Sequence, residues 1–392
     1  MPLLPLIGLA DDLTGAAEIA AIAHNAGLRA VIHTTVPAGL KEVDVLILDT
    51  NTRLLPPVKA ARRVRLFVDQ IAGIPHAGLF KKIDSVVRGP VLAELKACAE
   101  ALDRRRILIV PSNPSSGRII KDGCYFISNQ PLHTTVFARD PHHPRLTSDV
   151  IGLLGAKKEP AVRCIPPTNP LPSAGIFVGE ADSPADVVFW AGQVDTHTLP
   201  AGGADFFRVW LHSRRAYQPP LQGYQLPEGG TLHINGTVSA PKPVSPFTAD
   251  TIGVNPSRLP SVESLVNRSL VILQERGVVA VTTRGPVVHD KHASFALTKI
   301  FALLASQLRA KDAFRHLLVA GGATASAVLQ ELEWTQFSVV NVWGPGAVTL
   351  QPTVAPTFAV TMKPGSYQWP ANLSYQFTSD FQSRRRKSGI PK

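Results

Sequence analysis

Short apolar runs alternate with helix-forming segments in the first part of the chain, and this alternation constrains the fold more than any other feature. The runs are apolar enough to form strands that are buried on both faces. Strands that alternate with helices build a parallel sheet with helices on both sides. The strands are expected at Leu4–Ala10, Ala30–Thr34, Val43–Asp49, Gly78–Ile83, Arg106–Val110 and Gly175–Gly179, and the helices at Ala16–Asn25, Val58–Ile71, Val91–Leu102 and Ser183–Thr196.

The same alternation returns after residue 230. Residues 216–230 are rich in Gln, Pro, Tyr and Gly and show no periodicity, which is typical of a linker. We therefore predict an α/β protein of two domains, residues 1–215 and 231–381, each a mainly parallel sheet flanked by helices, and a tail over 382–392. In the second domain, strands are expected at Thr231–Ile234, Val278–Thr282 and His316–Ala320, and helices at Leu265–Arg276, Ala293–Arg309 and Ser326–Leu332.

The net charge of +11 raises the question of a nucleic-acid partner. Five of these charges lie in the tail, and no aromatic-interleaved basic stripe or nucleic-acid motif accompanies them. We therefore expect a solvated basic tail and no nucleic-acid partner, with nucleic-acid binding as the alternative to test. A basic surface also suits anionic substrates. The tail cations are Arg384, Arg385, Arg386, Lys387 and Lys392.

Targeting and redox features point to a cytoplasmic protein. No apolar run approaches the length that spans a bilayer, so no membrane partner is expected. The N-terminus lacks a basic region before its apolar run and is expected to be part of the core. Cys98, Cys124 and Cys164 lie far apart and match no zinc or redox spacing, so we expect reduced, structural thiols.

Two carboxylates follow the first predicted strand, in the segment Asp11-Asp12-Leu13-Thr14-Gly15. Ligands of open α/β sheets bind at the carboxyl ends of the strands, where these residues are expected to lie. A helix N-terminus also favours negative charge, so Asp11, Asp12 or Thr14 can cap the helix. Capping needs only one residue, which leaves the second carboxylate to bind a sugar hydroxyl and help deprotonate it.

A second polar cluster, residues 81–89, follows the strand that ends near Ile83. Strand alternation places Lys82 and Asp84 on one face and Lys81 on the other. With Arg88 on the following turn, these groups offer a fork for a carboxylate or phosphate and an acid for hydroxyls. The alternative is an internal Lys–Asp ion pair that only closes the turn.

The loop Pro111–Gly117 follows another strand, and Arg118 can reach a ligand anion from it. An ordinary surface arginine is the alternative. Three histidines, His133, His142 and His143, lie further along the chain. They show no HxxxH or HExxH spacing, so hydrogen bonding in turns is expected in preference to metal binding.

Glycine turns mark the second domain. Gly321-Gly322-Ala323-Thr324 follows a strand, and glycines free backbone N–H groups that can hold phosphate. Two more turns of this kind occur, at residues 235–239 and 362–366. No Walker A sequence and no GxGxxG follows a strand, so neither a P-loop nor a standard dinucleotide site is expected.

Taken together, these motifs resemble the four-carbon acid sugar kinase family, whose members phosphorylate threonate, erythronate or 3-oxo-tetronate with ATP. The motifs occur in one order over nearly the whole chain: ADDLTGA, KKIDSVVRG, PSNPSSGR, PLHTTVFARDPHHP, NGTVSAP, GGATASAV and MKPGS. The resemblance implies an N-terminal acid-sugar-binding domain, a C-terminal nucleotide-binding domain and an active site in the cleft between them. It implies ATP and Mg²⁺ as cofactors and suggests a homodimer.

The resemblance also assigns roles by position, while the metal ligands stay unassigned. The acid's carboxylate is expected on Arg88 and Lys82, and Asp12 or Asp84 is expected to position the terminal hydroxyl and accept its proton. The substrate-binding set is Asp11, Lys82, Ser85, Arg88 and Arg118, and the nucleotide-binding set is Thr237, Ser239, Gly321, Gly322, Thr324 and Gly365.

The chain departs from the family pattern in the second domain. Ala323 stands where the family usually has an acidic residue, and Lys363–Gln368 replaces its closing Lys-x-Gly-x-Phe-Gly. A missing carboxylate can weaken the binding of Mg²⁺ or ribose. These departures motivate an alternative, a non-catalytic or weakly active family member that binds a sugar acid.

Overall fold

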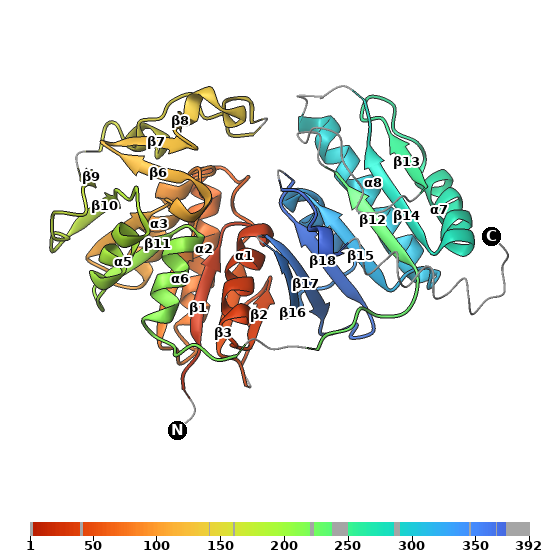
Figure 1. The fold of residues 1–392 in the computed structure, drawn as a ribbon, viewed down its shortest axis with the longest axis horizontal. Helices are drawn as coiled ribbons and strands as arrows, with labels where there is room; N and C mark the ends of the chain where they lie inside the picture. Colours follow the sequence, from red (N-terminus) through yellow and green to blue (C-terminus); the bar gives the residue numbers. More distant parts are fainter. Residues whose placement is uncertain are drawn as a thin grey trace. The chain divides into compact units, whose positions relative to one another are not determined.

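The computed structural model describes residues 3–39, 42–140, 142–159, 161–219, 223–236, 250–285, 291–344, 346–365 and 367–373. The chain forms two compact units, Met1–Pro220 and Leu221–Lys392, which we call the N-terminal and C-terminal units (Figure 1). Each unit contains a mainly parallel sheet flanked by helices, which confirms the predicted fold class. The predicted tail 382–392 lies outside the described residues.

The sheet of the N-terminal unit has the strand order β2-β3-β1-β4-β11-β5-β10-β9, and neighbouring strands are parallel. Its strands are β1 Leu6–Ala10, β2 Ala30–His33, β3 Val45–Asp49, β4 Gly78–Lys82, β5 Arg106–Val110, β9 Val162–Ile165, β10 Gly175–Gly179 and β11 Thr198–Gly202. The larger helices are α1 Leu13–Asn25, α2 Pro57–Ile71, α3 Val91–Ala101, α5 Pro184–Gly192 and α6 Ala204–His212. In Figure 1, α1 and α6 cover one face, and α2 and α3 cover the other.

The helices next to β1 follow from their sequences. Helix α1 is rich in alanine, and most of its residues are buried. A side chain at Gly8 in β1 would meet Ile19 of α1, because a Cβ there would lie 2.7 Å from its Cδ1 atom. Glycine at this position therefore lets α1 pack closely on the sheet. Helix α2 instead buries an apolar stripe that includes Val64, Val68 and Ile71, as its predicted amphipathic pattern requires.

The strand order places a topological switch point at β1. Strand β1 lies between β3 and β4, and the chain passes from β3 to β4 through α2. Because α1 and α2 cover opposite faces, the turns after β1, β3 and β4 lie together at the carboxyl edge of the sheet, the position at which open α/β sheets bind ligands. The polar segments that begin at Asp11, Thr50 and Ile83 all lie at this edge.

A small antiparallel sheet follows β5 and was not expected from the sequence. Its strands are β6 Arg118–Lys121, β7 Cys124–Ile127 and β8 Gln130–Pro131, followed by short helices η2 Leu132–Thr134, η3 Val136–Arg139 and α4 Val150–Leu153. Asp122 and Gly123 connect β6 to β7 with φ values of 49° and 72°. Positive φ at both turn residues is typical of a tight hairpin, and Asp-Gly is its usual sequence.

The sheet of the C-terminal unit has the strand order β13-β14-β12-β15-β18-β17-β16. The strands from β13 to β18 in this order are parallel, and β17 and β16 are antiparallel additions that the sequence analysis did not predict. The strands are β12 Thr231–Asn235, β13 Thr251–Val254, β14 Val278–Thr283, β15 His316–Ala320, β16 Gln336–Gly344, β17 Ala347–Pro352 and β18 Ala359–Lys363, and the helices are α7 Val262–Arg276, α8 Lys291–Ala310 and α9 Gly322–Glu331.

Two predicted helix boundaries were wrong for identifiable reasons. Helix α9 begins at Gly322 and not at Ser326, because only Gly321, with φ of 103°, departs from helical geometry. Helix α1 begins at Leu13 and not at Ala16, because Asp12 caps it. Within the described ranges, no helix is long and apolar enough to cross a membrane. The three cysteines are free, in agreement with the predicted structural thiols.

Candidate functional site

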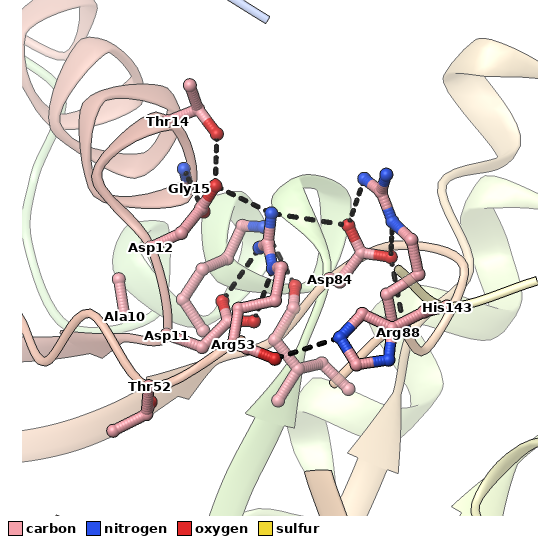
Figure 2. Close-up of polar contacts among 12 residues, drawn as sticks. Ala10, Asp11, Asp12, Thr14, Gly15, Thr52, Arg53, Asp84, Arg88 and His143 are labelled. Carbon is pink, nitrogen blue, oxygen red and sulfur yellow. Dashed lines mark hydrogen bonds and ion pairs between the residues drawn. The ribbon is translucent and has the colours of Figure 1, made fainter. Parts of the chain in front are cut away.

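Asp11 and Asp12 lie at the carboxyl end of β1, where the chain enters α1 (Figure 2). Asp12 caps the helix: its carboxylate accepts hydrogen bonds from the Gly15 backbone N–H at 2.8 Å and the Thr14 hydroxyl at 2.5 Å. Capping therefore falls to Asp12 and not to Asp11. The side chain of Asp12 remains 16% exposed, so it is still accessible from solvent.

Arg53 links both carboxylates, and the sequence analysis missed it. Its Nε and Nη2 atoms donate to the two oxygens of Asp11 at 2.7 and 2.9 Å, and its Nη1 donates to Asp12 at 2.6 Å. Nη1 also lies 3.6 Å from an oxygen of Asp84. Burial alone would raise the pKa of Asp11, but Arg53 lowers it below its usual value. Arg53 ends the polar run that follows β3. A polar run directly after a strand is also the signal that identified the turns after β1 and β4.

Asp84 organises the turn after β4. One carboxylate oxygen accepts the backbone N–H groups of Val86 and Arg88, each at 3.1 Å, and the Nε of Arg88 at 3.0 Å. The other oxygen accepts Nη2 of Arg88 at 2.7 Å. Burial would raise the pKa of Asp84, but Arg88 and Arg53 hold it well below its usual value. Asp84 is therefore a fully engaged, ionised group.

Arg88 is less available to a ligand than the sequence analysis expected. Besides its two contacts with Asp84, it donates from Nη1 to Asp140 at 2.9 Å. The turn is thus closed by an internal ion pair, but its cation is Arg88 and not Lys82. Lys82 pairs with Glu18 of α1 at 3.1 Å.

Lys81 and Lys82 point to opposite faces of β4, as strand alternation predicts. Lys81 pairs with Glu94 of α3 at 2.7 Å, whereas the partner of Lys82, Glu18, lies on α1. Both lysine side chains are almost completely buried. The expectation that Lys82 provides a free cation for the acid's carboxylate is therefore not met: an internal glutamate already matches its charge.

Arg118 is different, because no described carboxylate forms an ion pair with it. It donates from Nη1 to the Ser85 hydroxyl, and the carbonyl of Ser85 accepts the Tyr125 hydroxyl at 2.6 Å. The guanidinium carbons of Arg118 and Arg88 each lie 5.7 Å from the centre of the Phe137 ring. The small antiparallel sheet thus delivers an unmatched cation, packed on an aromatic ring, beside the turn after β4.

The predicted turn hydrogen bonds occur at the backbone of His142 and His143, whereas the rings of His133 and His143 bond residues distant in the sequence. The Nε2 of His143 donates to the backbone carbonyl of Arg53 at 3.0 Å (Figure 2). Asp140 accepts the backbone N–H groups of His142 and His143, and a ring nitrogen of His133 bonds the Ser148 hydroxyl. In the described part of the chain, no group of His, Cys, Asp or Glu is arranged to hold a metal ion.

Asp49 is a buried carboxyl group that the sequence analysis did not single out. It ends β3, is 1% exposed, and accepts the Asn51 backbone N–H at 2.8 Å. Strand register places it beside Ala10, directly before the two aspartates of β1. Burial and the negative charge of Asp12 raise the pKa of Asp49 to about 7.

The raised pKa of Asp49 predicts that the free energy of unfolding depends on pH. Its pKa is about 7 in the folded state against an ordinary value of 3.8, so the folded state loses stability as the pH rises from about 4 to about 7. Asp49→Asn removes this penalty and is expected to stabilise the protein at pH 8 by up to about 4 kcal/mol, at 1.36 kcal/mol per pKa unit.

Urea unfolding at pH 4 and pH 8 measures this effect. The gain should be present at pH 8 and absent at pH 4. Asp69→Asn is the control, because the Asp69 side chain is 52% exposed, and its stability change should be small at both values. Equal effects of Asp49→Asn at pH 4 and pH 8 would contradict the expected titration.

In the C-terminal unit, three strands end at the same level. Asn235 of β12 pairs with Ala320 of β15, which pairs with Lys363 of β18. The predicted residues Gly321, Gly322 and Thr324 follow β15 and open α9, and Gly365 follows β18. Thr237 and Ser239 lie outside the described residues.

The turn geometry fits an anion. Gly321 adopts φ of 103°, and no side chain caps α9. A Cβ at Gly236 would lie 2.0 Å from the Thr324 hydroxyl, so glycine is required where the end of β12 meets the first turn of α9. Exposed Ala323 provides no charge, and the first turn of α9 contains no acidic residue. Backbone N–H groups at this helix start are therefore free of side-chain caps.

Family models match both units. A model described as a sugar-binding N-terminal domain matches residues 6–174, and one described as a nucleotide-binding C-terminal domain matches residues 249–367. Together they include the candidate residues of the N-terminal unit and, in the C-terminal unit, Gly321, Gly322, Thr324 and Gly365.

The proteins with similar sequences include two kinases of four-carbon sugar acids. A D-threonate kinase of Bordetella bronchiseptica is 29% identical over 231 residues, 54% of this chain but only 57% of that protein. A 3-oxo-tetronate kinase of Methylobacterium radiotolerans is 26% identical over 378 residues, 84% of this chain and 88% of that protein. A solved structure of a Haemophilus influenzae protein covers 95% of this chain and 99% of its own with a TM-score of 0.70; at 19% identity, it supports the fold alone.

Proposed function

Because the chain belongs to the four-carbon acid sugar kinase family, we propose that it transfers the γ-phosphoryl group of ATP to the terminal hydroxyl of a four-carbon sugar acid. Threonate, erythronate and 3-oxo-tetronate are the candidate acids. The observation that carries this proposal is a juxtaposition at the carboxyl edge of the N-terminal sheet: carboxylates of two neighbouring turns converge on Arg53, and Arg118, which no described carboxylate matches, bonds Ser85 in the second of these turns.

Arg118 is the proposed anchor of the acid's carboxylate. The single described hydrogen bond of its side chain goes to the Ser85 hydroxyl, which leaves most of its guanidinium N–H donors for a ligand. Arg88 also has unused N–H donors, but its charge is matched by Asp84 and Asp140. Arg118 and Ser85 therefore bind the carboxylate, while Arg88 and Lys82 shape the site around it.

Asp12 is the proposed acceptor of the hydroxyl proton. Its side chain is 16% exposed, whereas that of Asp84 is only 5% exposed. Asp84 thus positions the turn after β4, and Asp11 fixes the position of the Arg53 side chain. In the reaction, the substrate hydroxyl oxygen bonds the γ-phosphorus, the bond from that phosphorus to its bridging oxygen breaks, ADP leaves, and the proton passes to Asp12.

The C-terminal unit is the proposed nucleotide site. Backbone N–H groups at Gly322 and Gly365, with the Thr324 hydroxyl, are suited to bind phosphate oxygens, while Gly321 turns the chain into α9 and donates its N–H to the Lys363 carbonyl. Mg²⁺ would supply charge neutralisation between the phosphates of ATP. Among the described residues, this turn presents the Thr324 hydroxyl but no carboxylate for the metal, so the ion's other ligands would be phosphate and water.

Ala323 provides a test of the missing carboxylate. Ala323→Asp places an acid in the first turn of α9, where the helix itself favours negative charge. We expect the variant to bind ADP more tightly in the presence of Mg²⁺ by about 1 kcal/mol, about fivefold. In EDTA the added charge should instead weaken ADP binding by repulsion. Calorimetric titrations with and without Mg²⁺ measure both effects, and weaker binding in both conditions would show that the wild-type site lacks no metal ligand.

A substrate screen tests the proposed function. ADP release should depend on a four-carbon sugar acid and should fall strongly when a neutral tetritol or a five-carbon acid replaces it. The alternative, a sugar-acid-binding protein without kinase activity, is motivated by Ala323 and the altered segment after Lys363. It predicts calorimetric binding of the acid with no ADP release in the presence of Mg²⁺ and ATP.

A further inference from the structure

Lys363 is a buried lysine that the proposed mechanism does not use. It ends β18 and is 5% exposed. Its ammonium donates to the backbone carbonyl of Pro364 at 3.2 Å and lies 5.2 Å from the centre of the Trp369 ring. No carboxylate in the described ranges forms an ion pair with it.

The other two buried lysines of the described chain provide a direct comparison. Lys81 pairs with Glu94 at 2.7 Å, and Lys82 pairs with Glu18 at 3.1 Å. A buried charge is costly unless a counter-charge matches it. Lys363 has no such match, and burial lowers its pKa to about 8. The free protein thus keeps an ammonium at a position where an anion would stabilise it.

The surroundings of Lys363 favour negative charge. Its carbonyl accepts the backbone N–H of Gly321, so it is directly tied to the glycine pair that opens α9. That helix start has neither a side-chain cap nor an acidic residue. The titratable groups on the same sheet face are His233 of β12 and His316 of β15, and burial lowers the pKa of each to about 3. Both histidines are therefore neutral at physiological pH, and neither supplies a counter-charge.

We propose that Lys363 binds a phosphate group of the nucleotide and supplies the positive charge of the phosphate cradle. This inference rests on the proposed nucleotide site and adds the residue that makes it selective for phosphate. An ammonium with three donors, of which the structure uses one, has two left for phosphate oxygens. Trp369 provides an apolar wall against the ammonium and a spectroscopic reporter beside it.

Paired titrations with ADP and adenosine test this proposal. Lys363→Met should weaken ADP binding about 10- to 100-fold, the range for a hydrogen bond to a charged group. Adenosine affinity should stay the same, because adenosine carries no phosphate. Lys363→Arg keeps the charge and should retain most of the affinity. Lys311→Met is the matched control, since Lys311 is an exposed lysine of the same unit, and its ADP affinity should equal that of the wild type.

Two further readouts separate ligand binding from a structural role. Wild-type affinity for ADP should fall as the pH rises from 8 to 10, because the neutral amine no longer attracts phosphate, and this fall should disappear in Lys363→Met and Lys363→Arg. Removal of an unmatched buried charge should leave the melting temperature of Lys363→Met unchanged or higher. ADP should change Trp369 fluorescence in the wild type more than in Lys363→Met.

Two outcomes would overturn the proposal. Unchanged ADP affinity in Lys363→Met would show that this ammonium does not bind phosphate, while the proposed kinase activity would stand. Equal losses of ADP and adenosine affinity, with a lower melting temperature, would show a structural role for Lys363. Failure of the wild type to bind ADP at all would instead reject the nucleotide site, and with it the proposed function.

Discussion

Asp12→Asn is expected to lower kcat by about 10²- to 10⁴-fold, the usual contribution of a positioned proton acceptor. The amide oxygen can still accept the Gly15 backbone N–H that caps α1, so the fold should persist. Arg53 also keeps its two bonds to Asp11. What the variant loses is the negative charge and the ability to take a proton. Steady-state kinetics with saturating ATP and acid measure the change, and circular dichroism confirms folding.

Asp84→Asn is the matched comparison for this variant. Asp84 accepts the backbone N–H groups and the guanidinium that shape the turn after β4, so its loss should lower stability and raise KM. Asp12→Asn should change mainly kcat. An unchanged kcat in Asp12→Asn would leave helix capping as the role of Asp12 and remove it from the chemistry.

Arg118→Ala is expected to raise KM for the sugar acid by about 30- to 4000-fold, which corresponds to about 2–5 kcal/mol for a desolvated charge contact. The reason is that Arg118 is the cation of this site that no described carboxylate matches. Arg118→Lys keeps the charge but loses the planar fork, so its KM should be intermediate. The KM for ATP should stay near the wild-type value.

Arg88→Ala provides the contrast to Arg118→Ala. It leaves Asp84 and Asp140 without their shared partner, so it should lower the free energy of unfolding. A neutral tetritol, if it serves as a poor substrate, should lose little in Arg118→Ala because it has no carboxylate to bind. A change in KM below about tenfold for the acid in Arg118→Ala would place the anchor elsewhere.

Local sequence patterns predicted the polar turns after β1 and β4, but not the turn after β3, and not which residues pair. The run Val45–Asp49 is as apolar as its neighbours, and the polar segment after it ends in Arg53. Its pairing with Asp11 and Asp12 depends on β3 lying next to β1, which is a property of strand order and not of local sequence. The same non-local order explains why Lys82, predicted beside Asp84, instead pairs with Glu18 of α1.

The small antiparallel sheet was missed for a different reason. Its Asp122-Gly123 turn is a strong hairpin signal, but the strands that flank it are only four residues each, and β6 begins and ends with a charged residue. Short strands of this kind depend on the contacts they make after folding, here through Tyr125 and Ser85. The sequence identified Arg118 only as a residue that can reach an anion. The small antiparallel sheet gives its side chain a definite position, beside the turn after β4.

The proposed reaction joins a phosphoryl group from ATP to a four-carbon sugar acid. Phosphorus NMR of the purified protein with Mg²⁺, ATP and each acid follows both products in one experiment. We predict that ADP and a new phosphomonoester signal grow together in equal amounts, with the phosphorus coupled to the protons of the terminal carbon. Release of inorganic phosphate alone, or growth of ADP at the same rate without the acid, would reject the proposed kinase activity.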